Sequence, residues 1–371
     1  MGDKDDKRKL QEVALSPIFI KRKRLNRRLT LSDSENSDDD SIDKESDSPS
    51  TPEDAELITF DTKIESLEDL ITLGKKYDRT KKYDFDMKKL NKMIPDIENI
   101  NNFIGLGDIK NKLVDHILFY LQSKNLKIDE KEKDIMHTII TGPPGVGKTE
   151  FARALGKLYL SMGVLRNNKF VKVTRADLVA KYLGQTAIKT KETINRCRGG
   201  VMFIDEVYSL GNKEQRDSFS KEAIDTLNEH LTEMKNDFIC IVAGYEEDVK
   251  SCFFAFNKGL QSRFPIRFQM EGYDYKDLFK ILKQKIDNTK WTLDEKITEL
   301  FFKDKMDQFE YYGRDIENLI TLVKRCHSRR VFTLSKSEKT KITMEDLKNG
   351  SKLFFDSNKK KEKFKYDSIY I

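Results

Sequence analysis

The segment from Gly142 to Thr149 reads GPPGVGKT and matches the pattern G-x-x-x-x-G-K-[ST] at every position. Glycines let a backbone curl so that its N–H groups point at phosphate oxygens, and the helix that follows presents its positive end to the same charge. In this pattern Lys148 reaches the β- and γ-phosphates, and the hydroxyl of Thr149 is placed to bind Mg²⁺. The predicted nucleotide-binding residues are Gly142, Pro143, Pro144, Gly145, Val146, Gly147, Lys148 and Thr149.

An acidic pair, Asp205 and Glu206, follows the apolar run at 201–204. A hydrophobic strand that ends in a carboxylate would place Asp205 at the carboxyl edge of a sheet, beside the phosphates, where it can hold the Mg²⁺ shell. Glu206 is suited to polarise an attacking water as general base. Two solvated acids at a strand end are the alternative interpretation.

Short apolar runs alternate with helix-like stretches around these motifs, which is typical of a parallel sheet covered on both faces. After Tyr273 only helical patterns remain, so a small helical domain should follow the α/β domain. The expected strands cover 137–141, 170–174, 201–204, 238–243 and 266–269. The expected helices cover 64–73, 109–121, 149–160, 221–234, 278–286, 297–302, 316–323 and 344–354.

These motifs and their spacing resemble those of AAA+ ATPases, and more narrowly those of the CbbX/CfxQ group. The resemblance covers about residues 100–330 and implies a P-loop NTPase sheet with helices on both faces, a helical lid, ATP and Mg²⁺ as ligands, and ATP hydrolysis. The segments that carry the narrower resemblance are GLGDIK at 105–110, DLVAKYLGQTAIKT at 177–190, GGVMFIDEVYSL at 199–210, VAGYEEDV at 242–249 and GLQSRFP at 259–265.

Charge and resemblance together divide the chain into five parts. We expect a disordered basic and acidic arm at 1–56, an N-terminal helical linker at 57–100, the large ATPase domain at 101–271, the helical lid at 272–356 and a basic tail at 357–371.

The resemblance also implies a role for a loop on the large domain. Tyr182, Leu183 and Gly184 match the aromatic–hydrophobic–glycine loop that lines the central pore of such rings and grips a polypeptide. An aromatic side chain on a glycine-flanked loop could grip an extended chain regardless of its sequence. A tyrosine packed against the core is the alternative.

Two arginines are given catalytic roles by the same resemblance. Arg263, in SRFP, resembles the arginine finger that enters a neighbouring subunit's nucleotide site, and Arg267 is close enough to compete for this role. Arg314, in YYGRDIENLI, resembles the lid arginine that senses the γ-phosphate. Surface or helix-capping arginines are the alternatives.

The chain departs from many AAA+ proteins at the end of the fourth strand. There Ala243, Gly244 and Tyr245 stand where an Asn or Thr commonly orients the water, so the side chain that does this is open. Ile104 and Gly105 lie where the resemblance places the adenine, and ordinary linker contacts are an equal alternative.

Charge is unevenly distributed along the 371 residues. Residues 21–28 contain six basic residues, which suit a nuclear localisation signal, a nucleic-acid contact or a solvated charge run. Residues 32–56 contain eleven acidic residues. No stretch approaches the roughly 18 apolar residues that would span a membrane, so no membrane partner is expected. We expect an intracellular protein, cytoplasmic or nuclear, in a eukaryotic setting that includes a virus infecting such a cell.

Three functions fit these features. The leading hypothesis is a ring-forming homo-oligomer, a hexamer, that remodels a protein client with ATP. A nucleic-acid motor or loader is possible but not favoured. The net charge of +10 from residue 57 onward suits phosphates, but the expected pore loop has one flanking lysine, Lys181, and no run of aromatics for base stacking. A slow ATP-binding adaptor is the third.

Overall fold

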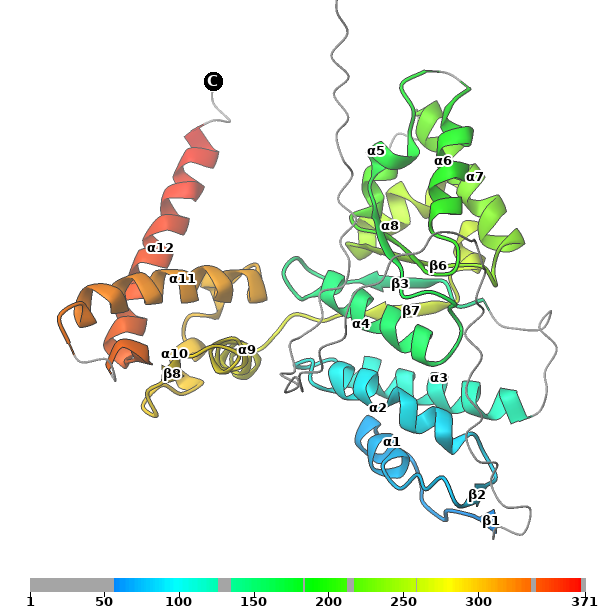
Figure 1. The fold of residues 1–371 in the computed structure, drawn as a ribbon. Coiled ribbons are helices and arrows are strands. Elements are labelled where there is room, and N and C mark those ends of the chain that lie inside the picture. Colours follow the sequence, from blue (N-terminus) through cyan, green and yellow to red (C-terminus); the bar gives the residue numbers. More distant parts are fainter. Residues whose placement is uncertain are drawn as a thin grey trace, which may run out of the picture.

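The computed structural model describes residues 57–125, 135–182, 184–211, 217–257, 259–334 and 338–367. The arm at 1–56 and its basic cluster lie outside this range. The described residues form an α/β domain, with a group of N-terminal helices on one face of its sheet, and a helical lid to one side (Figure 1). In this part of the chain, no helix combines the length and the apolar character needed to cross a membrane.

The core of the α/β domain is a sheet of five parallel strands. Its order is β4 (Phe170–Val173), β5 (Val201–Ile204), β6 (Ile239–Gly244), β3 (Thr138–Thr141) and β7 (Ile266–Gln269). The predicted parallel sheet is confirmed. Strands β5 and β6 are buried along their whole length, which explains why they read as unbroken apolar runs.

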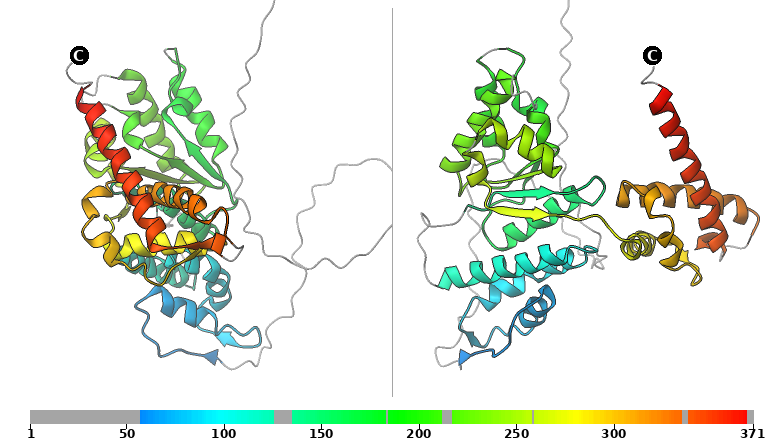
Figure 2. Two further views of the ribbon diagram at one scale, coloured as in Figure 1. Left: turned by 90° about the vertical axis from the view of Figure 1, so that its left-hand side faces the viewer. Right: turned by 180° about the vertical axis from the view of Figure 1, so that it is seen from behind.

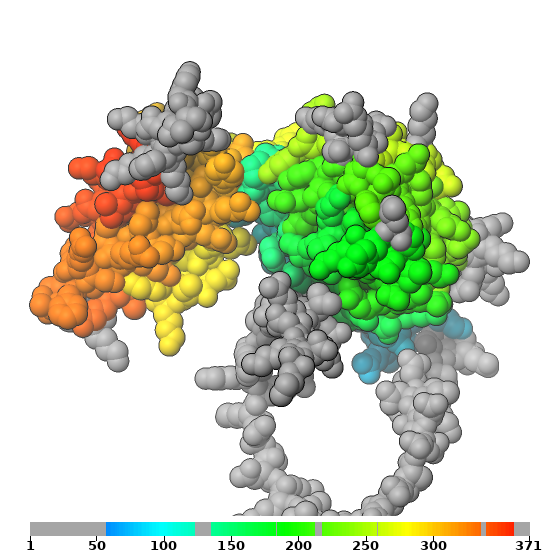
Figure 3. Space-filling view, turned by 90° about the horizontal axis from the view of Figure 1, so that it is seen from above, coloured from blue at the N-terminus to red at the C-terminus, as the bar shows by residue number. Residues whose placement is uncertain are grey.

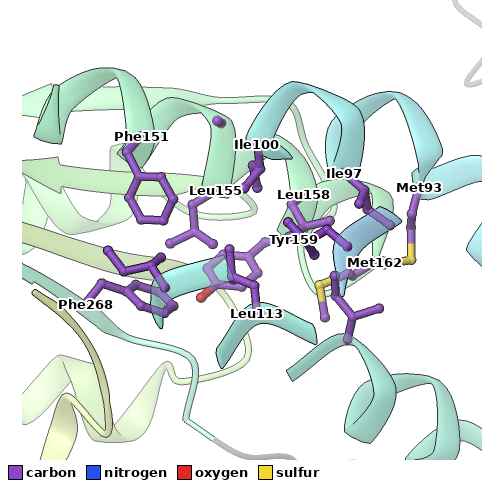
Figure 4. Packing of buried hydrophobic residues seen from close by; sticks show 14 of the residues in the cluster. Met93, Ile97, Ile100, Leu113, Phe151, Leu155, Leu158, Tyr159, Met162 and Phe268 are labelled. Carbon is purple, nitrogen blue, oxygen red and sulfur yellow. The ribbon is translucent and has the colours of Figure 1, made fainter. Parts of the chain in front are cut away.

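Four helices lie on one side of the sheet, and the N-terminal one packs on the other helices rather than on the sheet itself (Figure 2). They are α1 (Leu67–Gly74), α2 (Met87–Asn101), α3 (Gly107–Asn125) and α4 (Lys148–Ser161). A capping box between Ser66 and Asp69 begins α1. Helices α2 and α4 pack together through apolar side chains, shown with Leu113 and Phe268 in Figure 4. The helices within 57–100 therefore share one core with the sheet.

The other face carries a second apolar cluster. It is covered by α5 (Arg175–Leu178), α6 (Thr186–Arg196), α7 (Ser218–Glu233) and α8 (Glu246–Cys252), with the 3₁₀ turns Val207–Leu210 and Leu260–Arg263 between them. Because all five strands are parallel, their carboxyl ends meet at one edge of the sheet. Residues that follow β3, β5 and β6 therefore come together at that edge.

The lid has its own core and forms a separate lobe beside the α/β domain (Figure 3). Its helices are α9 (Tyr275–Asp287), α10 (Leu300–Lys303), α11 (Tyr312–Val331) and α12 (Met344–Asp367). Two-residue strands, β8 (Thr292–Leu293) and β9 (Lys341–Ile342), pair here although only helices were expected, because two residues are too short to leave a pattern. A similar pair, β1 (Leu57–Ile58) and β2 (Lys82–Tyr83), lies at the N-terminal end. Helix α12 continues to Asp367, so most of the expected basic tail is helical.

Candidate nucleotide site

The loop from Gly142 to Gly147 connects β3 to α4 at the carboxyl edge of the sheet. Gly142 donates its N–H to the carbonyl of Gly244 on β6, at 3.3 Å. Gly147 caps α4 with a φ of +91°, a left-handed conformation that glycine adopts without a steric penalty. The structure thus forms the curled loop and helix start that the motif predicts.

Lys148 is held inside this loop. Its Nζ donates to the carbonyls of Gly142 and Pro143, both at 2.8 Å, and lies 5.0 Å from the centre of the Tyr245 ring. Burial lowers the pKa of Lys148, and the carboxylates of Asp205 and Glu206 oppose that shift. Charged phosphate oxygens are stronger acceptors than neutral carbonyls, so they could draw the ammonium away from the loop.

The structure brings Thr149 and Asp205 together. The Thr149 hydroxyl donates to Oδ2 of Asp205 at 3.1 Å. Hydroxyl and carboxylate oxygens are the ligands that Mg²⁺ prefers, and it usually takes only one or two protein ligands beside phosphates. The described residues contain no group of three His, Cys, Asp or Glu side chains that could hold a metal. A Mg²⁺ ion at this edge would take Thr149 and Asp205 as its protein ligands, and it would supply positive charge against the phosphates.

Lys172 belongs to this site but was not predicted. It lies on β4 opposite Phe203 of β5, and its Nζ is 2.9 Å from Oδ2 of Asp205. The same carboxylate oxygen accepts from Thr149. A lysine inside an otherwise apolar strand, FVKV, was the available signal, but its partner depends on which strands are neighbours.

Glu206 is exposed and has an unusual backbone conformation, with a φ of +51°. A non-glycine residue in the left-handed region is uncommon and is often found at functional sites. Its N–H donates to Oδ1 of Asp205 at 3.1 Å. The strand end thus places the two acids side by side but in different surroundings.

The lid contacts the backbone of the loop directly. The N–H of Gly313 donates to the carbonyl of Gly145 at 3.1 Å, and the Tyr273 hydroxyl donates to the carbonyl of Val146 at 2.8 Å. A Cβ added to Gly145, whose φ is +78°, would lie 1.9 Å from the carbonyl oxygen of Tyr311. Only glycine fits here, because the lid backbone lies against it.

Arg314 lies in the first turn of α11, beside these contacts. Its charge is close enough to contribute to the lowered pKa of Lys148, after the larger effect of burial. Ile104 packs against the lid core, and Gly105, with a φ of +68°, lies beside the side chains of Tyr273 and Asp277. The residues expected at the adenine thus lie at the junction of linker and lid.

The other two arginines lie away from the loop of their own chain. Arg263 bonds to the Thr232 hydroxyl at 3.0 Å and the Gly259 carbonyl at 3.1 Å, just before β7 begins. Arg267, on β7, lies 5.9 Å from the centre of the Phe254 ring. It also lines a cavity of about 500 Å³ between α3, α8 and β7, which is beside the nucleotide loop rather than at it.

The expected pore loop lies before α6. Tyr182 is 69% exposed, so it is not packed against the core. Gly184 has a φ of +78° and open space around it, whereas Leu183 lies outside the described residues. Ile188, in the first turn of α6, is 61% exposed and adds an apolar side chain to this surface, which the sequence pattern did not single out.

The chain is similar to known proteins over the part that contains this site. Residues 138–271 match the family model "ATPase family associated with various cellular activities (AAA)". The chain is 38% identical over 313 residues to the putative cfxQ-like protein R730 of Acanthamoeba polyphaga mimivirus, covering 82% of this chain and 76% of that one. The chain belongs to the CfxQ-type AAA+ ATPases.

Other relatives of this CfxQ-type chain are more distant or cover less of it. The CfxQ homolog of Galdieria sulphuraria is 31% identical over 264 residues, which is 68% of this chain and 86% of that protein. Stage V sporulation protein K of Bacillus subtilis is 43% identical over 163 residues, 44% of this chain and 50% of its own length. Membership of the AAA family implies that the chain binds a nucleotide.

Proposed function

We propose that this CfxQ-type protein hydrolyses Mg·ATP and uses the energy to remodel a polypeptide. The observation that carries the proposal is the convergence of Lys148, Thr149 and Asp205 at one sheet edge, with Thr149 Oγ1 3.1 Å from Asp205 Oδ2. Glu206 beside them is the proposed general base, a role worth about 10²–10⁴-fold in rate. These three residues and Glu206 are all of the types that ATP hydrolysis needs, which favours an active enzyme.

The proposed active form is a closed ring of about six subunits. Arg263 supports a ring because it makes its hydrogen bonds with α7 and its own turn, away from the loop of its own chain. In a head-to-tail ring it would enter the neighbour's site, where an added positive charge is worth about 10³–10⁵ in rate. The lid contacts at Gly145 and Val146 would pass nucleotide-dependent movement to the rest of the ring.

The exposed Tyr182 supports a polypeptide client. In this proposal its ring contacts the extended client and moves with the nucleotide state. The name of one relative, Stage V sporulation protein K, refers to a cellular process and specifies no client. The mimivirus relative fits the expectation of a virus-encoded protein.

The test is the ATPase rate of the full chain with an unfolded polypeptide, and separately with single-stranded DNA, as salt is raised. We expect the polypeptide to stimulate hydrolysis and Tyr182→Ala to abolish the stimulation while leaving the unstimulated rate unchanged. Stimulation by DNA that decreases steeply with salt would favour the nucleic-acid motor. Slow turnover that neither ligand stimulates, and that Glu206→Gln barely alters, would favour the adaptor.

A further inference from the structure

At the end of β6, where many AAA+ proteins carry an Asn or Thr, this chain has Ala243, Gly244 and Tyr245, and Tyr245 belongs to an aromatic pair. Tyr245 follows β6 directly, and its ring lies nearly parallel to that of Tyr208, with centroids 5.5 Å apart and planes 18° apart. Offset stacked rings at this separation attract one another beyond the area they bury. The pair therefore links the end of β6 to the turn that follows β5.

The pair touches both halves of the nucleotide site. The Lys148 ammonium lies 5.0 Å from the centre of the Tyr245 ring, within the range of a cation–π interaction. Tyr208 lies in the 3₁₀ turn Val207–Leu210, whose N-terminal neighbour is Glu206. Stacking thus sets the separation between the Lys148 ammonium and the Glu206 segment.

Local packing holds the two rings in place. A Cβ added to Gly244 would lie 2.7 Å from Cγ2 of Val249 and 3.2 Å from Cδ1 of Tyr208, so the Tyr208 ring rests close to the β6 backbone. Burial, with Glu206 nearby, raises the pKa of Tyr208 to about 12. Tyr208 therefore remains a neutral phenol at physiological pH.

We propose that Tyr245, braced by Tyr208, is a positioning residue for ATP hydrolysis. The face of its ring fixes the Lys148 ammonium, and the stack fixes the segment that carries Glu206. The aromatic pair thus replaces the single amide or hydroxyl that orients the reacting groups in many AAA+ proteins. This inference rests on the proposed ATPase function.

The test compares Tyr245→Leu, which removes the ring, with Tyr245→Phe, which keeps it. We expect Tyr245→Leu to lower kcat at least about tenfold, which is part of the 10²–10⁴-fold that a positioned general base contributes. Its dissociation constant for labelled ADP should stay within about threefold of the wild-type value, because the backbone N–H groups of the loop remain. Tyr245→Phe should restore kcat to within about threefold, and Tyr208→Leu and Tyr208→Phe should behave in the same way.

Tyr77→Leu is the control, because it breaks another tyrosine pair, with Tyr83, far from the loop. It should leave kcat unchanged. Several results would overturn the inference: a normal kcat in Tyr245→Leu, equal losses in the Phe and Leu variants, or a joint loss of affinity and thermal stability. If the wild type hydrolyses no Mg·ATP while it still binds ADP, the proposed ATPase function fails and the inference with it.

Discussion

The contact between Gly145 and the lid gives a prediction whose size follows from the structure. In Gly145→Ala the new Cβ would lie 1.9 Å from the Tyr311 carbonyl oxygen, so loop and lid must separate by about 1 Å or more. A non-glycine residue at a φ of +78° costs roughly 1–2 kcal/mol, and losing the 3.1 Å bond from Gly313 costs about 0.5–1.5 kcal/mol more. The closed form should therefore lose about 1.5–3.5 kcal/mol.

Gly184→Ala is the control, because it introduces the same backbone strain as Gly145→Ala without a steric clash. Its φ is also +78°, but no atom lies within 4 Å of the added Cβ. By hydrogen exchange, the Gly313 amide should become less protected in Gly145→Ala and remain unchanged in Gly184→Ala. Nucleotide affinity should fall about tenfold or more only in Gly145→Ala. Equal exchange at Gly313 in the two variants would refute the proposed contact between lid and loop.

Three further predictions test other parts of the molecule. Lys172→Met removes the ammonium that pairs with the Asp205 oxygen proposed to bind Mg²⁺. The Mg²⁺ concentration that gives half-maximal turnover should therefore fall about threefold. An unchanged Mg²⁺ titration would count against competition between the Lys172 ammonium and Mg²⁺. Arg263→Ala should reduce turnover about 10³-fold while nucleotide binding is unaffected, and a larger loss in Arg267→Ala would reassign the arginine finger. In the lid, burial would raise the pKa of Asp346, but hydrogen bonds from Arg330, the Thr343 backbone and His327 outweigh it and lower the pKa. The resulting stability is present above about pH 4 and decreases as the pH falls further. In urea unfolding, the free energy of unfolding of Asp346→Asn at pH 7 should be lower than that of the wild type by on the order of 3 kcal/mol. Below pH 4 it should also change less with pH, and equal pH dependence in the two proteins would contradict this.

The sequence predicted the sheet and the nucleotide loop because both are local patterns. A buried parallel strand leaves an apolar run, and each functional residue follows such a run directly, as Asp205 follows β5. Helix α2 was not among the expected helices, because Pro95 lies in its interior and proline is disfavoured there.

Contacts that depend on which elements are neighbours could not be predicted. The Lys172–Asp205 ion pair requires β4 to lie beside β5, and the stack of Tyr208 on Tyr245 requires the ends of β5 and β6 to meet. The motif predicts a glycine at 142 and 147, whereas the need for glycine at 145 comes from the approach of the lid.

The central claim, an ATP-dependent ring with shared active sites, is tested most directly by the subunit count of Glu206→Gln in native mass spectrometry. Without its general base this variant should bind Mg·ATP and retain it. We predict a closed ring of about six subunits with Mg·ATP and smaller species without it. A monomer or dimer under both conditions would contradict the ring and the role of Arg263 in a neighbouring subunit.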